Sequence, residues 1–241
     1  MTLLRIEGIG KSFGGVQALR DISFSVDEGG IVGIMGANGA GKTTLFSIVA
    51  GNTTPSTGAV YLKGDRITGR KPHRIARAGI ARTFQITRPF RGLSVRENAA
   101  TALQFGTCQL GKRAADQAVD DILALTGLEG IADSLAGDLT LSDQKRLEVA
   151  RALAAGPQLI LLDEVMAGLT PTEVGDLMDI VRQIRDERGI TVLIIEHVMG
   201  ALMKLSDKII VLHLGEKVAE GAPAAVAADP AVQDAYLGAT P

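Results

Sequence analysis

The chain of 241 residues is long enough for one large domain, or for one domain with a sizeable insert. Hydrophobic residues make up 46% and charged residues 22%, as in globular proteins with a buried core, and the net charge of -2 disfavours nucleic acid as the main partner. The single cysteine, Cys108, excludes an internal disulfide and fits a reducing compartment. The N-terminal residues lack the pattern of a signal peptide and no apolar run approaches the ~20 residues of a membrane span, so we expect a cytoplasmic protein that meets a membrane only through a partner.

The first part of the chain alternates between strand and turn patterns. Strands are predicted at Leu3–Ile9, Ile22–Val26 and Ile31–Met35, with glycine-containing turns between them. A helix is predicted from about Lys42 to Val49, directly after a glycine-rich loop, and residues 51–70 return to strand and turn. We therefore expect an N-terminal antiparallel β part that leads into an α/β core.

Residues 91–140 have a different composition, with alanine, glutamine and charged residues at helical spacing, as in Ala114–Leu125, which predicts an inserted α-helical subdomain. Beyond it we predict a strand, a helix, a strand, a hairpin and a closing helix, at Leu159–Leu162, Pro171–Arg188, Thr191–Ile195, Lys208–Glu220 and Ala224–Leu237. Because the strand patterns are apolar throughout, they favour a parallel sheet covered on both faces. The prediction is one α/β domain over residues 1–241.

One motif points directly to a ligand. The segment GANGAGKT matches G-x-x-x-x-G-K-[ST] in full and lies between an apolar strand and a helix, as a P-loop requires. Glycines let backbone N–H groups surround phosphate oxygens, and the helix N-terminus adds partial positive charge. The alternative, a glycine-rich turn with a chance lysine, would not need this placement. Lys42 is expected to contact the β- and γ-phosphates of ATP, Thr43 to contact Mg²⁺, and the whole loop to bind the nucleotide: Gly36, Ala37, Asn38, Gly39, Ala40, Gly41, Lys42, Thr43 and Thr44.

Two acids, Asp163 and Glu164, follow the apolar strand Leu159–Leu162. The carboxyl end of a buried parallel strand is where α/β proteins bind ligands, so we expect both acids beside the phosphate loop. Asp163 is then a ligand of Mg²⁺, direct or through water, and Glu164 the general base that polarises the attacking water. The alternative is that both acids only cap the following turn.

A histidine repeats this arrangement, because His197 comes just after the apolar strand Thr191–Ile195. It is placed to form a hydrogen bond with the γ-phosphate and so to sense its presence. A lone histidine is more often structural, and that alternative stays open here. His73 and His213 lack such a context, and we expect them at the surface or in packing roles.

In the order of its motifs the chain resembles the ATPase subunits of ABC transporters over essentially its whole length, and more narrowly those of branched-chain amino-acid importers of the LivG-like type. The segments FGGVQAL, ARTFQ, FRGLSVREN and KRLEVARAL carry the narrow resemblance, at Phe13–Leu19, Ala81–Gln85, Phe90–Asn98 and Lys145–Leu153. LivF-like subunits usually have a proline-glutamate stretch where ARTFQ stands, which favours the LivG-like type. The resemblance implies a P-loop NTPase core with an inserted α-helical subdomain.

The resemblance assigns further roles. Phe13 stands where an aromatic ring stacks on adenine, although a buried strand-end phenylalanine is the alternative. Gln85 stands in the Q-loop, which contacts Mg²⁺ or the water and relays movement to membrane subunits. Ala167–Thr170 occupies the D-loop of the subunit interface, and the inserted helices would dock onto a membrane partner.

Two positions depart from the family pattern. The signature loop usually reads LSGGQ, whereas this chain has Leu139, Thr140, Leu141, Ser142 and Asp143. Thr140 keeps a hydroxyl, but Ser142 replaces a glycine and Asp143 adds a carboxylate that opposes phosphate binding at a helix start. Because the signature acts on the partner's nucleotide, we hypothesise that this chain lends a weakened signature to its neighbour. Val165 replaces the proline that usually follows the catalytic glutamate, which matters less because no contact is lost.

The resemblance also implies partners and a place in the cell. Two ATPase subunits, this chain with a LivF-like subunit or with itself, would close around two ATP molecules. They would drive transmembrane permease subunits from the inner face of the membrane, with a periplasmic binding protein involved indirectly and no nucleic acid. The alternatives are an ATPase of another ABC system such as lipopolysaccharide export, a soluble ATP-dependent switch, and a non-enzymatic module in which nucleotide only regulates assembly. The transported molecule is not encoded in this chain.

Overall fold

A computed structural model describes residues 1–83, 88–107 and 110–237 of the chain. The chain forms two compact units. The first unit combines residues 1–75 with residues 191–241, and the second consists of residues 76–190. The prediction of one domain with a helical insert at 91–140 stays a prediction.

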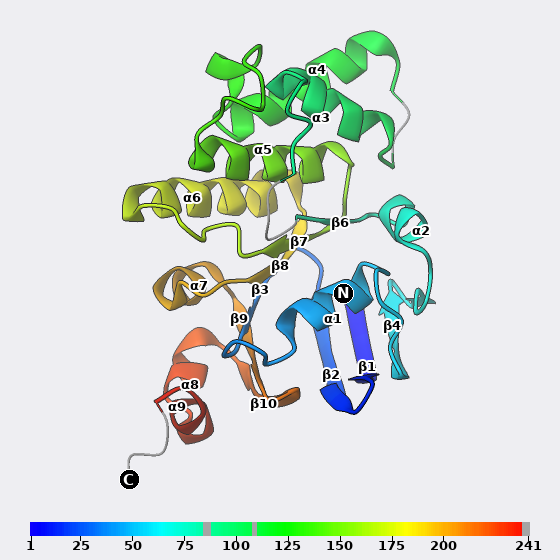
Figure 1. The fold of residues 1–241 in the computed structure, drawn as a ribbon, viewed down its shortest axis with the longest axis vertical. Coiled ribbons are helices and arrows are strands. Elements are labelled where there is room, and N and C mark those ends of the chain that lie inside the picture. The colour runs from blue at the N-terminus through cyan, green and yellow to red at the C-terminus, as the bar shows by residue number, and fades with distance from the viewer. Residues whose placement is uncertain (84–87, 108–109, 238–241) are drawn as a thin grey trace. The chain divides into compact units, whose positions relative to one another are not determined.

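The first unit begins with an antiparallel sheet in the order β2-β1-β4-β5 (Figure 1). Its strands are β1 (Thr2–Phe13), β2 (Val16–Asp27), β4 (Thr57–Leu62) and β5 (Asp65–Arg66). The turn between the two long strands falls at Gly14 and Gly15, as expected from glycine's tolerance of turn conformations. The predicted N-terminal antiparallel part is therefore confirmed, with longer strands than the apolar patterns alone outline.

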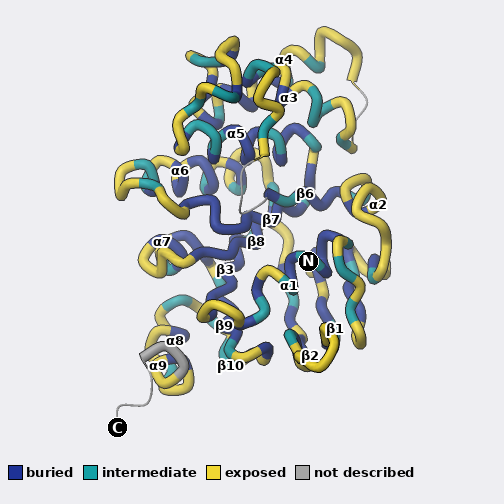
Figure 2. The backbone as a smooth tube through the Cα atoms, viewed as in Figure 1, coloured by how far each residue is buried: buried dark blue, intermediate teal, exposed yellow. Residues whose placement is uncertain are grey.

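A second sheet of this unit has the order β10-β9-β3-β8. Its strands are β3 (Ile31–Met35), β8 (Thr191–Ile195), β9 (Lys208–His213) and β10 (Glu216–Gly221). Strand β3 runs parallel to both β8 and β9, and every residue of β3 and β8 is buried, as the dark-blue tube in Figure 2 shows. Burial on both faces explains why these strands are apolar throughout rather than alternating.

The helices of the first unit are short. They are α1 (Lys42–Val49), α7 (Met199–Leu205), α8 (Pro223–Ala227) and α9 (Pro230–Leu237), while α2 (Pro72–Arg77) spans the point where the chain passes to the second unit. The prediction of one closing helix over Ala224–Leu237 is wrong, because α8 ends at Ala227 and a separate helix, α9, begins at Pro230. Pro230 has no N–H to continue the ladder and disfavours the α conformation in the residue before it.

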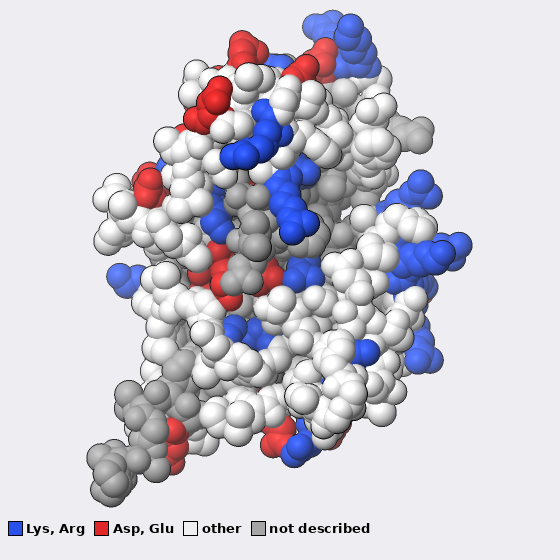
Figure 3. All heavy atoms as spheres, in the orientation of Figure 1, with Lys and Arg blue, Asp and Glu red and all other residues white. Residues whose placement is uncertain are grey.

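The second unit pairs two parallel strands, β6 (Ile80–Arg82) and β7 (Leu159–Asp163). Its helices are α3 (Val95–Gln104), α4 (Lys112–Leu125), η1 (Glu129–Ile131), α5 (Leu141–Ala154) and α6 (Pro171–Arg188). Helices α3 and α4 pack on each other and on α5 (Figure 1). Basic side chains, in blue, and acidic side chains, in red, both appear on the face of the molecule that Figure 3 shows. Within the described ranges, no helix is both long enough and apolar enough to cross a membrane.

Candidate nucleotide-binding site

The glycine-rich loop joins β3 to α1 and depends on its glycines. At Gly36, a Cβ atom would lie 2.4 Å from the carbonyl oxygen of Leu212, so no larger residue fits without movement of backbone. Gly41 has a φ of 98° and is the N-cap residue of α1. Only glycine adopts that conformation readily. This turn therefore requires glycine at both positions.

Lys42 lies at the first position of α1, and its side chain folds back over the loop. Its Nζ donates hydrogen bonds to the carbonyl oxygens of Gly36 at 2.8 Å and Ala37 at 3.1 Å. Gly41, as N-cap, has no side chain with which to cap α1, and no acidic residue lies in the first turn. The N-terminal N–H groups of α1 thus combine with a nearby ammonium group, which is the arrangement that binds phosphate.

His197 belongs to the same unit as the loop. The parallel pairing of β3 with β8 sets Ile34 opposite Ile195, so both strands end at the same edge of the sheet. Met35 leads from that edge into the glycine-rich loop, and Glu196 leads to the exposed His197. The described geometry places the imidazole at the sheet edge from which the loop emerges.

Phe13 ends β1 in the same unit, and its side chain is not buried. Half of Phe13 is exposed, and the ammonium of Lys11 lies 4.8 Å from the ring centroid. The alternative of a buried strand-end phenylalanine is therefore wrong. An exposed ring remains available to stack on another flat group.

In the second unit, Asp163 is fully buried at the end of β7. One carboxylate oxygen, Oδ2, accepts a hydrogen bond from Arg82 Nη2 at 2.7 Å, and the backbone N–H of Asp163 donates to Thr83 Oγ1 at 3.0 Å. The other oxygen, Oδ1, is buried and has no hydrogen-bond partner among the described residues. A buried carboxylate oxygen without a donor is a suitable ligand for a hard cation such as Mg²⁺.

Glu164, the next residue, has a left-handed backbone conformation with a φ of 53° and is 7% exposed. Its carbonyl oxygen accepts a hydrogen bond from Lys145 Nζ on α5 at 3.1 Å. A non-glycine residue with positive φ is strained, and such strain occurs often at functional sites. Val165, where the family usually has proline, is buried in the core.

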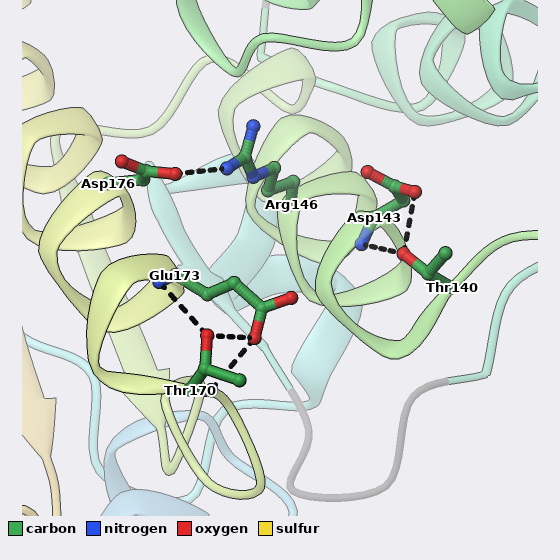
Figure 4. A network of polar contacts seen from close by, with 6 residues as sticks. All are labelled: Thr140, Asp143, Arg146, Thr170, Glu173 and Asp176. Carbon is green, nitrogen blue, oxygen red and sulfur yellow. Dashed lines mark hydrogen bonds and ion pairs between the residues drawn. The ribbon is translucent and has the colours of Figure 1, made fainter.

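The signature segment forms the N-terminus of α5, and its own side chains close that end. Thr140 is the N-cap residue: its hydroxyl accepts the N–H of Asp143 at 3.2 Å and donates to Asp143 Oδ2 at 2.6 Å (Figure 4). The carboxylate of Asp143 therefore lies in the first turn, where an external anion would otherwise be favoured. Leu141 is exposed, whereas Ser142 is buried.

A set of polar contacts lies between this helix and α6, which follows the segment Ala167–Thr170. Thr170 and Glu173 form a capping box at the start of α6, and Arg146 Nη2 lies 3.0 Å from Asp176 Oδ2 (Figure 4). The pKa of Glu173 is lowered because its carboxylate accepts hydrogen bonds from the backbone and the hydroxyl of Thr170, and from the hydroxyl of Ser142. The ion pair between Arg146 and Asp176 thus joins α5 to α6.

The predicted site residues therefore fall into two sets, one in each unit. The first unit carries the loop, Phe13 and His197, and the second carries Asp163, Glu164 and the signature; Gln85 lies outside the described residues. Within the described ranges, no group of three or more His, Cys, Asp or Glu side chains could hold a metal.

Sequence reasoning missed two neighbours of the strand-end acids. Lys145 and Arg82 contact them, and each is nearly buried despite its charge. The available signal for Arg82 was an arginine in the short apolar strand β6, a position where an unpaired charge is costly. Such a residue implies a buried partner, but the sequence does not name it.

Comparison with known proteins agrees with this chemistry. Residues 19–167 match the ABC transporter family, and residues 216–240 match the family described as branched-chain amino acid ATP-binding cassette transporter. The chain is 35% identical to the high-affinity branched-chain amino acid transport ATP-binding protein BraF of Pseudomonas aeruginosa and 36% identical to LivG of Escherichia coli K12, with 98% of both chains covered in each case. It is 34% identical to the lipopolysaccharide export system ATP-binding protein LptB of Escherichia coli K12, over 99% of this chain and 98% of LptB.

Solved structures give the same assignment. The ADP conformation of MJ1267, an ATP-binding cassette of an ABC transporter, matches with a TM-score of 0.87 at 31% identity, over 99% of both chains. A dimeric, post-hydrolysis structure of the cassette MJ0796 with ADP and phosphate matches with a TM-score of 0.81 at 25% identity, over 92% of this chain and 99% of the other. The P-loop NTPase fold is therefore confirmed, and the chain belongs to the ABC transporter family as one of its ATP-binding, ATP-hydrolysing subunits.

Proposed function

We propose that the chain binds Mg-ATP through the loop from Gly36 to Thr44 and hydrolyses it with Glu164 as general base. Lys42 and the N–H groups of α1 bind the phosphates, and Phe13 stacks on the adenine. Thr43, Asp163 and Gln85 hold Mg²⁺, which would neutralise charge on the phosphates. Glu164 accepts a proton from the attacking water, and His197 donates a hydrogen bond to the γ-phosphate.

The start of α1 carries this proposal through two features. Its first turn contains no acidic residue, and Lys42 lies directly over the loop. Phosphate binding needs both features, because the N–H groups supply direction and the lysine supplies charge. The buried, unpartnered Oδ1 of Asp163 supports the assignment of Mg²⁺.

Steady-state hydrolysis by Glu164→Gln tests the catalytic role. Loss of a general base is expected to slow turnover by roughly 10²- to 10⁴-fold while ATP binding stays within a few fold of wild type. Glu187→Gln, an exposed carboxylate on α6, serves as the matched control and keeps full activity. Wild-type turnover by Glu164→Gln would assign the base to another residue.

The partners in this proposal are a second ATPase subunit, LivF-like or a second copy of this chain, and transmembrane permease subunits. The chain then works at the inner face of the membrane, with a periplasmic binding protein acting only through the permease. Membership of a transporter family supports a membrane partner, and the dimeric MJ0796 structure supports pairing of cassettes. Co-purification of the tagged chain with permease subunits from detergent extracts tests this, and recovery of the chain alone would count against it.

For the cargo we propose branched-chain amino acids or related small compounds, taken up into the cell. The match of residues 216–240 to the branched-chain amino acid family and the names of BraF and LivG support this choice. LptB, at a similar identity, supports lipopolysaccharide export as the second candidate. Uptake of labelled leucine by vesicles with the reconstituted transporter separates the two, because an export ATPase would give no uptake.

The signature of this chain leads to a further part of the proposal: in a dimer with a conventional partner, one ATP site is fast and one is slow. The carboxylate of Asp143 is bound to Thr140 at the start of α5, where the partner's γ-phosphate would have to approach. Single-turnover hydrolysis by the reconstituted pair is expected to be biphasic. Two equally fast sites would refute this.

A further inference from the structure

The ion pair between Arg82 and Asp163 is deeply buried in the second unit. The side chains are 8% and 1% exposed, and Nη2 of Arg82 lies 2.7 Å from Oδ2 of Asp163. Both residues come from the parallel pair β6 and β7, in which Arg82 lies opposite Leu161. The pair therefore lies within one unit.

The two oxygens of this carboxylate have different surroundings. Oδ2 receives the guanidinium, whereas Oδ1 is buried and has no hydrogen-bond partner within the described ranges. The next residue of the same segment, Thr83, accepts the backbone N–H of Asp163 at 3.0 Å. Arg82, the last residue of β6, and Thr83, which follows it, thus fix one oxygen and the backbone of Asp163, and they leave a single oxygen open.

A buried carboxylate needs a cation nearby. Removing one member of a buried ion pair strongly destabilises a protein, because the remaining charge is left desolvated and uncompensated. In a metal-binding carboxylate this cost would arise whenever the metal leaves. A resident guanidinium removes the cost, but it also reduces the attraction of the carboxylate for a second cation.

We propose that Arg82 is a positioning residue that serves as the internal counter-cation of Asp163. It holds Oδ2, compensates the charge while no metal is bound, and leaves Oδ1 as the one oxygen offered to a divalent cation. The protein thereby gains stability in the metal-free state and binds the divalent cation less tightly. The proposal rests on the proposed function only where it assigns Asp163 to the metal.

A double-mutant cycle in EDTA, without nucleotide, tests the ion pair independently of the metal. Arg82→Gln is expected to raise the equilibrium constant of unfolding in urea by roughly 100-fold or more, since an unpaired buried charge remains. In an Asp163→Asn background, Arg82→Gln should raise the equilibrium constant of unfolding by a factor that is at least roughly tenfold smaller. The reason is that no carboxylate charge is left for Arg82 to compensate. Equal costs in the two backgrounds would overturn the proposal.

Two further variants keep this test decisive. Arg182→Gln removes the guanidinium of an exposed pair with Asp179, also at 2.7 Å, and should change unfolding by less than roughly fivefold. If Arg82→Gln is insoluble, then solubility of the Arg82→Gln/Asp163→Asn double variant supports the proposal. A double variant as insoluble as Arg82→Gln alone, beside soluble Asp163→Asn, would contradict it.

Mn²⁺ tests the link to the metal. In the presence of ATP, we measure the Mn²⁺ concentration that gives half of the metal-dependent rise in melting temperature. Arg82→Gln is expected to lower this concentration several-fold, because the carboxylate no longer shares its charge, whereas Arg82→Lys should stay near wild type. An unchanged or higher concentration would overturn the counter-cation role. A wild-type protein with no response to Mn²⁺ would instead overturn the metal assignment itself.

Discussion

The N-termini of α1 and α5 are the same kind of structure with opposite outcomes. At α1 the N-cap residue is Gly41, which has no side chain, and the first turn contains no acid. At α5 the N-cap residue is Thr140, whose hydroxyl is bound to both the N–H and the carboxylate of Asp143. One helix start remains available for an external anion, and the other already holds one of its own.

This difference shows that a helix dipole alone does not make a phosphate site. All helix starts carry partial positive charge, but α5 uses that charge within its own first turn, as α3 and α6 do with their capping boxes. Helix α4 also has a glycine N-cap, no acid in its first turn and a lysine as its first residue. What distinguishes α1 is the glycine-rich loop before it, whose carbonyl oxygens at Gly36 and Ala37 accept hydrogen bonds from Lys42. Exchanging the first-turn acid between α1 and α5 should exchange their properties.

The largest expected effect comes from giving α1 the acid that α5 has. Thr44 is the third residue of α1, as Asp143 is of α5. Thr44→Asp would place a carboxylate beside the triphosphate, where like charges a few ångströms apart cost about 4 kcal/mol at an effective dielectric of about 20. We expect ATP affinity to fall by roughly 100-fold or more in a calorimetric titration. Thr44→Asn is the neutral control, and equal affinities for the two variants would contradict this.

The reverse change opens α5. Asp143→Asn removes the charge that opposes the partner's phosphate and keeps the size of the side chain. We expect hydrolysis by the dimer to rise by roughly three- to tenfold, with about 0.3–1 kcal/mol lost from the free energy of unfolding because the helix loses a favourable acid. Asp138→Asn, just before the signature, should change neither quantity. A fall in turnover for Asp143→Asn would mean that the carboxylate assists hydrolysis.

A smaller effect is expected where capping only stabilises. Thr170 accepts the N–H of Glu173 and donates to its carboxylate at the start of α6. Thr170→Ala should lower the free energy of unfolding by about 1 kcal/mol, measured in urea. Thr172→Ala, an exposed threonine in the same turn, is the matched control. If both changes cost the same, the capping box contributes nothing.

The smallest effect is a dependence on pH. The pKa of Glu173 is lowered in the folded chain by hydrogen bonds from the backbone and hydroxyl of Thr170, from the usual 4.5. Its contribution to stability is therefore present above pH 4.5 and is lost as the pH falls through the folded-state pKa. The wild type and Glu173→Gln should therefore differ in their unfolding midpoint above pH 4.5. This difference should shrink as the pH falls from 4.5 through the folded-state pKa. A difference that does not change with pH would contradict the shift.

Much of this comparison could be predicted from the sequence, because local signals define helix starts. The bounds of α1 and α6 follow from a P-loop and from Thr170, Pro171 and Gly189, each of which acts within a few residues. The closing helix was misjudged at Pro230, although that signal was also local. The pairing of Arg82 with Asp163 could not be predicted, because it depends on which strand lies next to β7.

The central claim is that α1 begins as an open phosphate site completed by Lys42. Calorimetric titration of Mg-ATP into Lys42→Ala tests it most directly, with Lys71→Ala, an exposed lysine of the same unit, as control. Loss of a charge-assisted hydrogen bond predicts roughly 10- to 100-fold weaker binding for Lys42→Ala and unchanged binding for the control. Wild-type affinity in Lys42→Ala would contradict the account.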